Sequence, residues 1–339
     1  TKSSVSQPNQ TMVVPHTASS TLPRRKRISP SDEVRVSSDR ESQGGFRSGF
    51  VAVAGLPNAG KSTLINSFFD AAPLITSWRP QTSRFHIRCI CTNEQRQIIF
   101  VDTPGWHKHK GKLEQYMLDE IKRGLDGVDV LLFVVDSSDP RIERNIKVYK
   151  KAVSTSSGVT HKVIVLSKVD KIARLDVLPL IERFAAECNP DEIIPLSATK
   201  KENLEALDKI LSTNLPEGPQ FYPDDILVDR PDDFVFSEFI REQLHRLTHA
   251  EVPFSVAVEV DEVKKGPKRI KIEATVYVER DSQKGIVIGA DGEAIQRVRS
   301  RAANRISKFT GLKVTLRIHV KVAEKWTEKV GRLRNLGYS

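Results

Sequence analysis

The stretch GLPNAGKST at residues 55–63 decides the fold of the first half of this chain. It follows an apolar run at residues 50–54, typical of a buried strand, and precedes a helix with apolar periodicity from Leu64. The glycines let backbone N–H groups converge on phosphate oxygens, and the helix N-terminus adds partial positive charge. Lys61 can then reach the β- and γ-phosphates, and the hydroxyl of Ser62 can bind Mg²⁺. The pattern predicts a phosphate-binding loop; the alternative, a glycine-rich turn without a ligand, does not explain the strand–loop–helix order.

Four more apolar runs follow, and they are predicted to be strands at residues 97–101, 130–135, 162–166 and 193–196. Three of these runs end in short polar loops: Asp102-Thr103-Pro104-Gly105, Ser167-Lys168-Val169-Asp170 and Ser197-Ala198-Thr199. In open parallel sheets, ligands lie beyond the carboxyl ends of the strands. We therefore expect an α/β fold, a P-loop domain whose mostly parallel sheet carries helices on both faces.

Each loop has a chemical role in a nucleotide site. Asp102 can hold Mg²⁺ through water, and the Gly105 amide can sense the γ-phosphate. The carboxylate of Asp170 can accept both N–H groups of a guanine edge, which adenine does not offer, and residues 197–199 suit the guanine oxygen. The expected nucleotide-binding residues are Gly55, Pro57, Asn58, Ala59, Gly60, Lys61, Ser62, Thr63, Asp102, Gly105, Ser167, Lys168, Asp170, Ser197, Ala198 and Thr199.

This ordered set of motifs resembles the translation-factor-like GTPases, and Asn58 within the phosphate loop is similar to the TrmE–Era group. The resemblance implies GTP and GDP as ligands, with Lys61, Asn58 and Gly105 as the catalytic groups. It also implies Mg²⁺ bound through Ser62, Ser83 and Asp102. In that group the asparagine can help to hold K⁺, so K⁺-stimulated hydrolysis is expected; the alternative for Asn58 is a turn residue.

Two positions depart from the family pattern. Ser167 stands where the base-reading motif begins with Asn, and a serine makes some of the same loop hydrogen bonds with a shorter arm. In the first switch, residues 80–84 read Pro-Gln-Thr-Ser-Arg, and Ser83 aligns with the threonine that senses Mg²⁺. Ser83 keeps the hydroxyl, and Thr82 is the alternative ligand. Guanine selectivity is expected to survive through Asp170.

The catalytic water has no evident side chain to position it. Ras-like enzymes use a glutamine at this place in the motif, whereas here Trp106 follows Gly105. A slow intrinsic rate is therefore expected. His107 and His109 lie close by and are interpreted as exposed switch residues, with no role as general base.

A second domain is expected after the first. We assign residues 1–45 to a disordered tail, 46–215 to the nucleotide-binding domain, 216–231 to a linker and 232–339 to the second domain. Within the second domain the patterns predict a helix at 234–249, strands at 254–260 and 270–278, a helix at 293–309 and a strand at 314–320.

The segment Ile288-Gly289-Ala290-Asp291-Gly292 lies between two helical stretches and resembles the Gly-x-x-Gly loop of a type II KH domain. Such a loop lets a nucleic-acid backbone approach closely, beside an apolar groove for single-stranded bases. The alternative is an ordinary corner between helices. The expected RNA-binding residues are Lys284, Ile286, Ile288, Gly289, Ala290, Asp291, Gly292, Arg297 and Arg301, in a helix that also carries Arg299 and Arg305. The family usually has lysine where Ala290 stands, which shifts the expected RNA contacts to Lys284 and the arginines.

The charge distribution supports this division. The chain of 339 residues carries a net charge of +10, and residues 251–339 hold 19 basic and 11 acidic residues, a net +8. Residues 51–250 are near neutral at −2, and residues 1–50 carry +4. A basic module is typical of nucleic-acid binding. The three cysteines have no zinc spacing, and no run is long enough to span a membrane, although peripheral membrane association stays open.

A GTPase domain with Asn58 followed by a KH domain resembles the Era family. That resemblance implies a GTPase that assembles the small ribosomal subunit, holds the 3′ end of the small-subunit rRNA, and is released by GTP hydrolysis. The alternatives are a nucleotide-gated RNA-binding scaffold with negligible turnover, and a tRNA-modification GTPase, for which no C-terminal Cys is visible. The Ser- and Arg-rich residues 1–45 suggest organellar import, with the chloroplast stroma favoured over the mitochondrial matrix and the bacterial cytoplasm.

Overall fold

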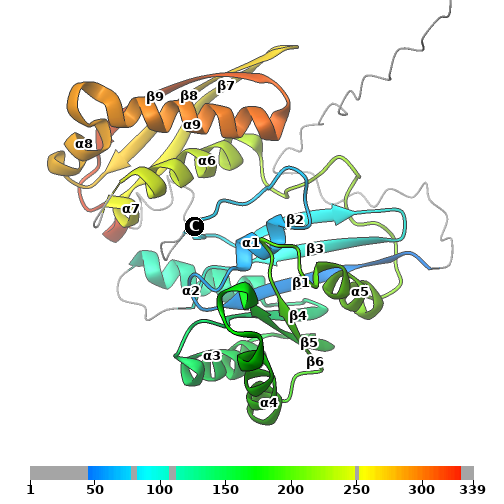
Figure 1. The fold of residues 1–339 in the computed structure, drawn as a ribbon. Coiled ribbons are helices and arrows are strands. Elements are labelled where there is room, and N and C mark those ends of the chain that lie inside the picture. Colours follow the sequence, from blue (N-terminus) through cyan, green and yellow to red (C-terminus); the bar gives the residue numbers. More distant parts are fainter. Residues whose placement is uncertain (1–44, 78–81, 107–111, 249–251, 330–339) are drawn as a thin grey trace, which may run out of the picture.

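The computed structural model describes residues 45–77, 82–106, 112–248 and 252–329. Residues 45–215 form the first domain, and the second domain begins at helix α6 (Asp232–Leu247). Figure 1 shows the two domains stacked, with α6 on the side of the second domain that faces the first. His107 and His109, with most of the first 45 residues, lie outside the described part of the chain.

A six-stranded sheet forms the centre of the first domain, in the order β2-β3-β1-β4-β5-β6. All neighbouring strands are parallel except β2, which pairs with β3 in the antiparallel sense and forms one edge. The sequence-based expectation of a mostly parallel sheet is therefore confirmed. The strands are β1 (Arg47–Gly55), β2 (Ile87–Thr92), β3 (Arg96–Asp102), β4 (Val130–Asp136), β5 (His161–Ser167) and β6 (Glu192–Leu196).

Helices cover both faces of this sheet because alternate residues of each strand point to opposite sides. Val51 and Val53 of β1 pack with the apolar residues of α1 and α5, while Ala52 and Ala54 pack with those of α2, α3 and α4. Both faces of β1 are therefore buried, which explains its continuous apolar run. The helices are α1 (Lys61–Asn66), α2 (Lys112–Gly124), α3 (Ile142–Thr155), α4 (Val177–Cys188) and α5 (Leu204–Asn214).

The linker packs against the first domain. Buried Gln97 in β3 accepts hydrogen bonds from the backbone N–H groups of Phe221 and Tyr222, both at 2.9 Å. Its amide group donates to the carbonyl of Tyr222 at 2.7 Å. The ring of Tyr222 packs on Ile90 of the edge strand β2 and Ile99 of β3. One glutamine side chain thus fixes the start of the path between the domains.

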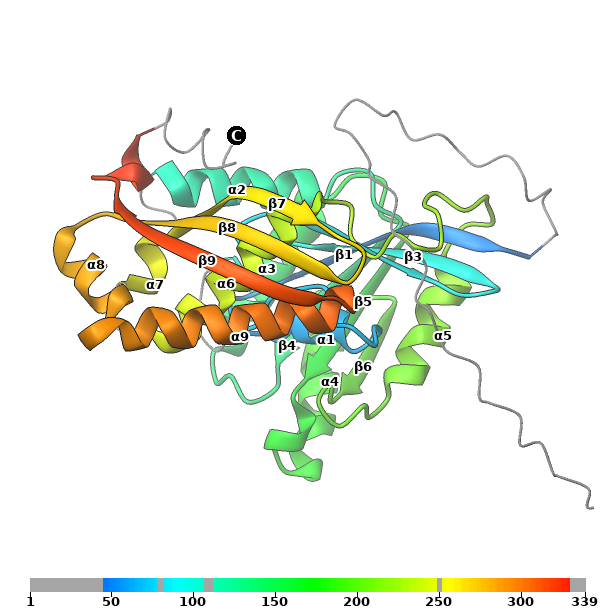
Figure 2. The ribbon, with the colours of Figure 1, turned by 90° about the horizontal axis from the view of Figure 1, so that it is seen from above.

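A three-stranded sheet in the order β7-β8-β9 forms the second domain (Figure 2). Strands β7 and β8 are antiparallel, and β8 and β9 are parallel. Apolar residues of α6 and α9 pack on one face of this sheet, where they contact alternate residues of β8 from Ile270 to Val278. The remaining elements are β7 (Ala257–Lys265), β8 (Arg269–Val278), β9 (Lys313–Val322), α7 (Val252–Ser255), α8 (Asp281–Ile288) and α9 (Glu293–Thr310).

One predicted strand is partly wrong. The strand expected at residues 254–260 begins only at Ala257, because residues 252–255 form the short helix α7. This turn directs the carbonyls of Pro253 and Phe254 toward Arg84 of the first domain. This helical turn supplies hydrogen-bond acceptors to Arg84, which lies about 170 residues earlier in the chain. No local sequence pattern could therefore indicate it.

Replacing Gln97 with Ala should lower the stability of the chain, because it leaves the backbone N–H groups of Phe221 and Tyr222 without their partner. The carbonyl of Tyr222 keeps its hydrogen bond from Gln220. The cost of unpaired buried polar groups predicts a loss of about 2–4 kcal/mol. Thermal unfolding measured by calorimetry checks it, with exposed Gln95→Ala as the matched control. Equal melting temperatures for the two variants would show that the linker contact contributes nothing.

Candidate functional site

The phosphate-binding loop connects β1 to α1 in a strained conformation that its glycines permit. Gly60 has φ 103°, and a Cβ on Gly55 would lie 2.3 Å from the carbonyl oxygen of Val134. Asn58 has φ 64°, a left-handed conformation that asparagine tolerates. The loop forms one wall of a cavity of about 720 Å³. The other described residues that line it include Lys61, Ser62, Thr63, Ile75, Thr76, Ser77, Thr82, Ser83, Gly105, Lys168 and Arg246.

Lys61 lies buried at the base of this cavity. Its ammonium group donates to the carbonyls of Gly55 at 3.3 Å and Leu56 at 3.1 Å. Burial lowers the pKa of Lys61 to about 8, and the nearby carboxylate of Asp102 only partly opposes this effect. A cation that is costly to bury gains from an anion brought beside it. The position of Lys61 therefore suits a phosphate group.

Three oxygen-bearing side chains meet beside Lys61. The hydroxyls of Ser62 and Ser83 each donate to Oδ2 of Asp102 at 2.9 Å, and their oxygens lie 3.1 Å apart. Burial raises the pKa of Asp102, against the opposing charge of Lys61. The second carboxylate oxygen, Oδ1, is buried and has no hydrogen-bond partner among the described residues. Hydroxyl and carboxylate oxygens are the ligands that Mg²⁺ prefers, so this group fits the ion.

The first switch contributes Ser83 to this group. Thr82 borders the cavity, but its backbone carbonyl accepts a hydrogen bond from Arg241 of α6. Of the two candidate ligands, the structure thus brings Ser83 to Asp102.

The residues expected to read guanine lie together at the ends of β5 and β6. Ser197 donates its hydroxyl hydrogen to Oδ1 of Asp170 at 2.6 Å, and this bond lowers the pKa of Asp170. The oxygen of Thr199 lies 3.4 Å from that of Ser197. Asp170 therefore stays ionised and oriented, as an acceptor of two N–H groups must be. The described wall of the large cavity reaches this region through Lys168.

Ser167 joins this region to the phosphate loop. Its buried hydroxyl lies 2.5 Å from the carbonyl oxygen of Ala59 and 2.9 Å from that of Val135, within hydrogen-bonding distance of both. Lys168 adds a bond to the carbonyl of Asn58 at 2.6 Å and an ion pair with Asp136. The serine hydroxyl thus connects the phosphate loop to the end of β4.

Gly105 approaches the phosphate loop so closely that an added Cβ would lie 2.7 Å from Pro57. Trp106, which stands where Ras-like enzymes have glutamine, is buried in the apolar cluster that the sheet forms with α2, α3 and α4. Its side chain therefore lies among apolar residues, and the described part of the cavity wall does not include it.

The second candidate site is the loop between α8 and α9. Gly289 and Gly292 have φ 77° and 78°, and a Cβ on Gly289 would lie 2.7 Å from Ala294. Asp291 is also left-handed, at φ 49°. Ile286 is about half exposed although it is a large apolar residue. These backbone conformations leave one face of the loop open to close approach, as a nucleic-acid backbone requires.

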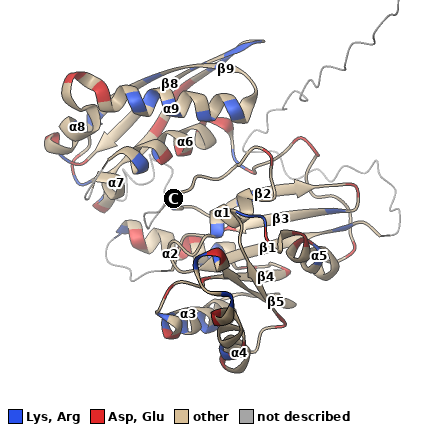
Figure 3. Ribbon diagram, viewed as in Figure 1, with Lys and Arg blue, Asp and Glu red and all other residues tan. Residues whose placement is uncertain are grey.

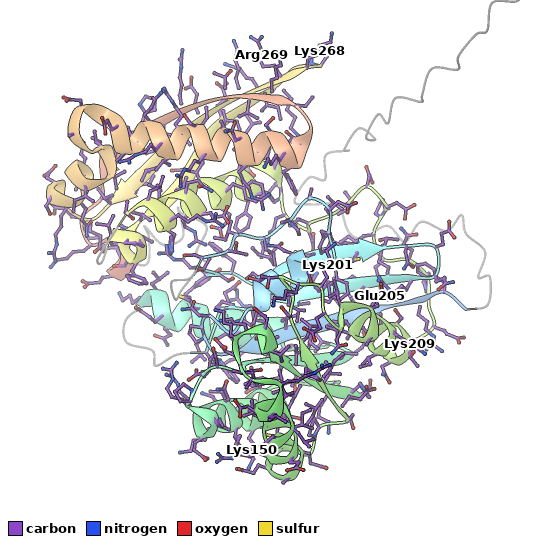
Figure 4. All side chains as sticks on the ribbon, viewed as in Figure 1. Lys150, Lys201, Glu205, Lys209, Lys268 and Arg269 are labelled. Carbon is purple, nitrogen blue, oxygen red and sulfur yellow. The ribbon has the colours of Figure 1, made fainter. Side chains whose placement is uncertain are left out.

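Exposed cations extend this surface along α9. Arg297 and Arg301 are exposed one helical turn apart on α9, while Ile288 is the last residue of α8 and Ala290 lies in the turn between the two helices. Figure 3 shows basic residues along α9, and Figure 4 shows Lys268 and Arg269 at the far tip of the β7–β8 hairpin. Lys284 is partly exposed on α8. The expected RNA-binding residues thus lie around α8, the α8–α9 loop and the first half of α9, at the end of the second domain opposite that hairpin tip.

Arg305 does not belong to this surface, which corrects the expectation that it lies with the other arginines. Its guanidinium donates to the carbonyls of Ala72 and Leu74 in the first domain and stacks 4.3 Å from the ring centre of Phe239. Burial lowers its pKa. The side chain therefore holds the two domains together.

Sequence analysis missed most of this interface. Arg84, directly after Ser83, is fully buried and donates to the carbonyls of Val256 and Phe254, both at 2.8 Å. Arg241 of α6 bonds to Glu238 and to the carbonyl of Thr82. Arg84 was visible as part of a motif, but its partners lie far along the chain and carry no sequence signal.

Comparison with known proteins finds a matching family for each of the two domains. Residues 50–168 match the family described as 50S ribosome-binding GTPase, and residues 251–327 match the KH domain. The chain is 41% identical over 295 residues to GTPase Era of Staphylococcus haemolyticus, which covers 86% of this chain and 97% of that protein.

Two solved structures are similar over 87% of this chain, each with a TM-score of 0.81 and 33% identity. One is an Aquifex aeolicus Era variant bound to GDP·AlF₄⁻, of which 100% is covered. The other is Era in complex with MgGDPNP and nucleotides 1506–1542 of 16S ribosomal RNA, of which 99% is covered. Within the described residues of the present chain, no helix is long and apolar enough to cross a membrane.

Replacing Ser83 with Ala should raise the Mg²⁺ concentration needed for half-maximal GTP hydrolysis by about tenfold. The ion loses an oxygen ligand that contributes about 1.4 kcal/mol to its binding free energy. A magnesium titration of the turnover rate measures the change. Thr82→Ala is the matched control and should change this concentration less. The assignment of Ser83 is wrong if Thr82→Ala has the larger effect.

Nucleotide binding should take up a proton above pH 8. Lys61 is largely neutral there before binding because its pKa lies near 8, and the bound phosphates restore its charge. Affinity should therefore fall as the pH rises from 8 to 9.5, and it should be nearly constant from 6.5 to 7.5. Calorimetric titration in buffers of different ionisation enthalpy measures the uptake; no uptake at pH 9 would contradict the role of Lys61.

Proposed function

Because this chain belongs to the Era family of GTPases, we propose that it assists assembly of the small ribosomal subunit by binding the 3′ end region of its rRNA. The chain is a GTPase with a C-terminal RNA-binding KH domain. The observation that carries the proposal is the likeness to Era holding nucleotides 1506–1542 of 16S rRNA, which extends over both domains. The open Gly289–Gly292 loop and the exposed arginines of α9 provide matching chemistry.

Hydrolysis relies on positioning. The phosphate-loop amides and Lys61 hold the phosphates, while Ser62, Ser83 and Asp102 would hold Mg²⁺, which supplies positive charge for the phosphoryl oxygens when bound. Gly105 lies against Pro57 of the phosphate loop, and its amide is the group proposed to sense the γ-phosphate. The described part of the site offers no side-chain general base, so a slow intrinsic rate is expected.

Asn58 gives a reason to propose stimulation by K⁺. Its carbonyl is already bonded to Lys168, so the side-chain oxygen is the group to consider for the ion. The left-handed backbone at Asn58 also suits a turn residue, which is the competing explanation. Hydrolysis compared in K⁺ and Na⁺ at equal ionic strength separates the two.

The GTP state is proposed to control RNA binding through the first switch. Ser83 contacts the magnesium-binding group, while its neighbours Thr82 and Arg84 bond to the second domain. Nucleotide that orders residues 82–84 also orders their contacts with α6 and α7. Hydrolysis would weaken these contacts and favour release of the RNA.

The second candidate function is a nucleotide-gated scaffold with negligible turnover, favoured by the burial of Trp106 away from the described cavity wall. Single-turnover hydrolysis with and without small subunits decides between the two. Hydrolysis that depends on Lys61 excludes the scaffold.

The organellar location suggested by residues 1–45 is a separate proposal. Tagged full-length protein found outside plastids would contradict the chloroplast assignment.

Crosslinking followed by RNA sequencing tests the assembly proposal. We expect enrichment of the 3′ end of small-subunit rRNA with wild-type protein and its loss with Arg297→Ala/Arg301→Ala. The matched control is Lys150→Ala/Lys209→Ala, which removes two exposed lysines on α3 and α5, away from the second domain (Figure 4).

The same variants predict a change in salt dependence. If Arg297 and Arg301 each contact a phosphate, their double variant should lower the slope of log affinity against log salt by about 1.4, and the lysine control should not. Filter binding of a single-stranded RNA from the 3′ end measures the slopes. Bound RNA without the small-subunit 3′ end, or equal slopes for both variants, contradicts the proposal.

A further inference from the structure

Arg246 brings a cation of the second domain to the nucleotide cavity. It lies in the last turn of α6 and lines the same 720 Å³ cavity as Lys61, Ser62 and Gly60 of the phosphate loop. Its side chain is 45% exposed, so the guanidinium is accessible from the cavity. None of the motifs in the first domain includes this residue.

A buried carboxylate holds Arg246 in this position. Oε1 of Glu242 accepts a hydrogen bond from Nη2 of Arg246 at 2.9 Å and another from the backbone N–H of Thr76 at 2.9 Å. Nη2 also donates to the carbonyl of Thr76 at 3.2 Å. The second terminal amino group, Nη1, makes no hydrogen bond among the described residues. Arg246 is thus oriented through one side of its guanidinium and keeps further donors.

The charged residues that line the cavity favour an anionic ligand. The described residues that line it include three cations, Lys61, Lys168 and Arg246, and no acidic residue. Lys168 is already ion-paired with Asp136. Arg246 is likewise ion-paired with Glu242, but neither Asp136 nor Glu242 lines the cavity. A nucleotide with several phosphate charges therefore meets three lining cations, of which only Arg246 comes from the second domain. Arginine suits phosphate because its planar group offers paired N–H donors.

We propose that Arg246 donates to a phosphate of the bound guanine nucleotide, so that a side chain of the second domain completes the nucleotide site. The nucleotide then favours the arrangement in which α6 lies against residues 74–77. By reciprocity, whatever stabilises that arrangement also tightens nucleotide binding. This role requires only that the chain binds a guanine nucleotide. It does not depend on which RNA the second domain binds.

The matched control for Arg246 is Arg305. Both arginines join the second domain to residues 72–76, and both pair with Glu242. The described wall of the cavity includes Arg246 and does not include Arg305. Loss of either weakens the domain contact, but only loss of Arg246 should remove a phosphate ligand.

The affinity of full-length variants for fluorescent GDP and for a magnesium-bound, non-hydrolysable GTP analogue tests the proposal. Arg246→Ala should weaken binding about tenfold or more, as expected for one charge-assisted hydrogen bond, and Arg305→Ala should weaken it clearly less. Arg246→Ala should also reduce the dependence of nucleotide affinity on salt concentration, which a purely structural contact would leave unchanged. Arg246→Lys should fall between wild type and Arg246→Ala.

Unchanged affinity in Arg246→Ala overturns the proposal. Equal losses in Arg246→Ala and Arg305→Ala, with equal salt dependence, also overturn it, because they would assign both residues to the domain contact alone. If the melting temperature shows that Arg246→Ala does not fold, Arg246→Lys compared with Arg305→Lys gives the same decision.

Discussion

The buried carboxylate of Asp102 connects the parts of this molecule that must act together. It accepts hydrogen bonds from Ser62 at the start of α1 and from Ser83 of the first switch, and it faces the ammonium group of Lys61. The phosphate loop, the end of β3 and the first switch therefore share one charged group. Any ion or phosphate that enters this point changes the electrostatic balance of all three.

Arg84, directly after Ser83, connects this point to the second domain. A buried guanidinium is costly unless its N–H groups are paired, and its described partners are backbone carbonyls of α7 and the residue that follows it. Separation of the domains would leave this charge without those partners. The same condition explains why the first switch lies against the second domain, where Arg241 and Arg305 add further contacts.

The parts of the site that follow strands were predictable from sequence. The phosphate loop, Asp102, Asp170 and Ser197 each stand at the end of an apolar run, and a parallel sheet brings such ends to one edge. The contacts of Ser83 and Arg305, by contrast, could not be predicted from sequence. A choice between Ser83 and Thr82 depends on which hydroxyl the folded switch turns toward Asp102, and Arg305 looks like its neighbours until its contact with the carbonyl of Ala72 is known.

By itself, the sequence determined an α/β nucleotide-binding domain, a basic second domain with a Gly289–Gly292 loop, and the residue types expected to meet phosphate, guanine and RNA. These are encoded locally, in apolar periodicity, glycine spacing and charge. Only the tertiary structure decided how the domains meet: the turn at residues 252–255, the burial of Arg84 and the entry of Arg246 into the nucleotide cavity. Those features depend on hydrogen bonds between residues about 170 positions apart, for which the chain carries no local pattern.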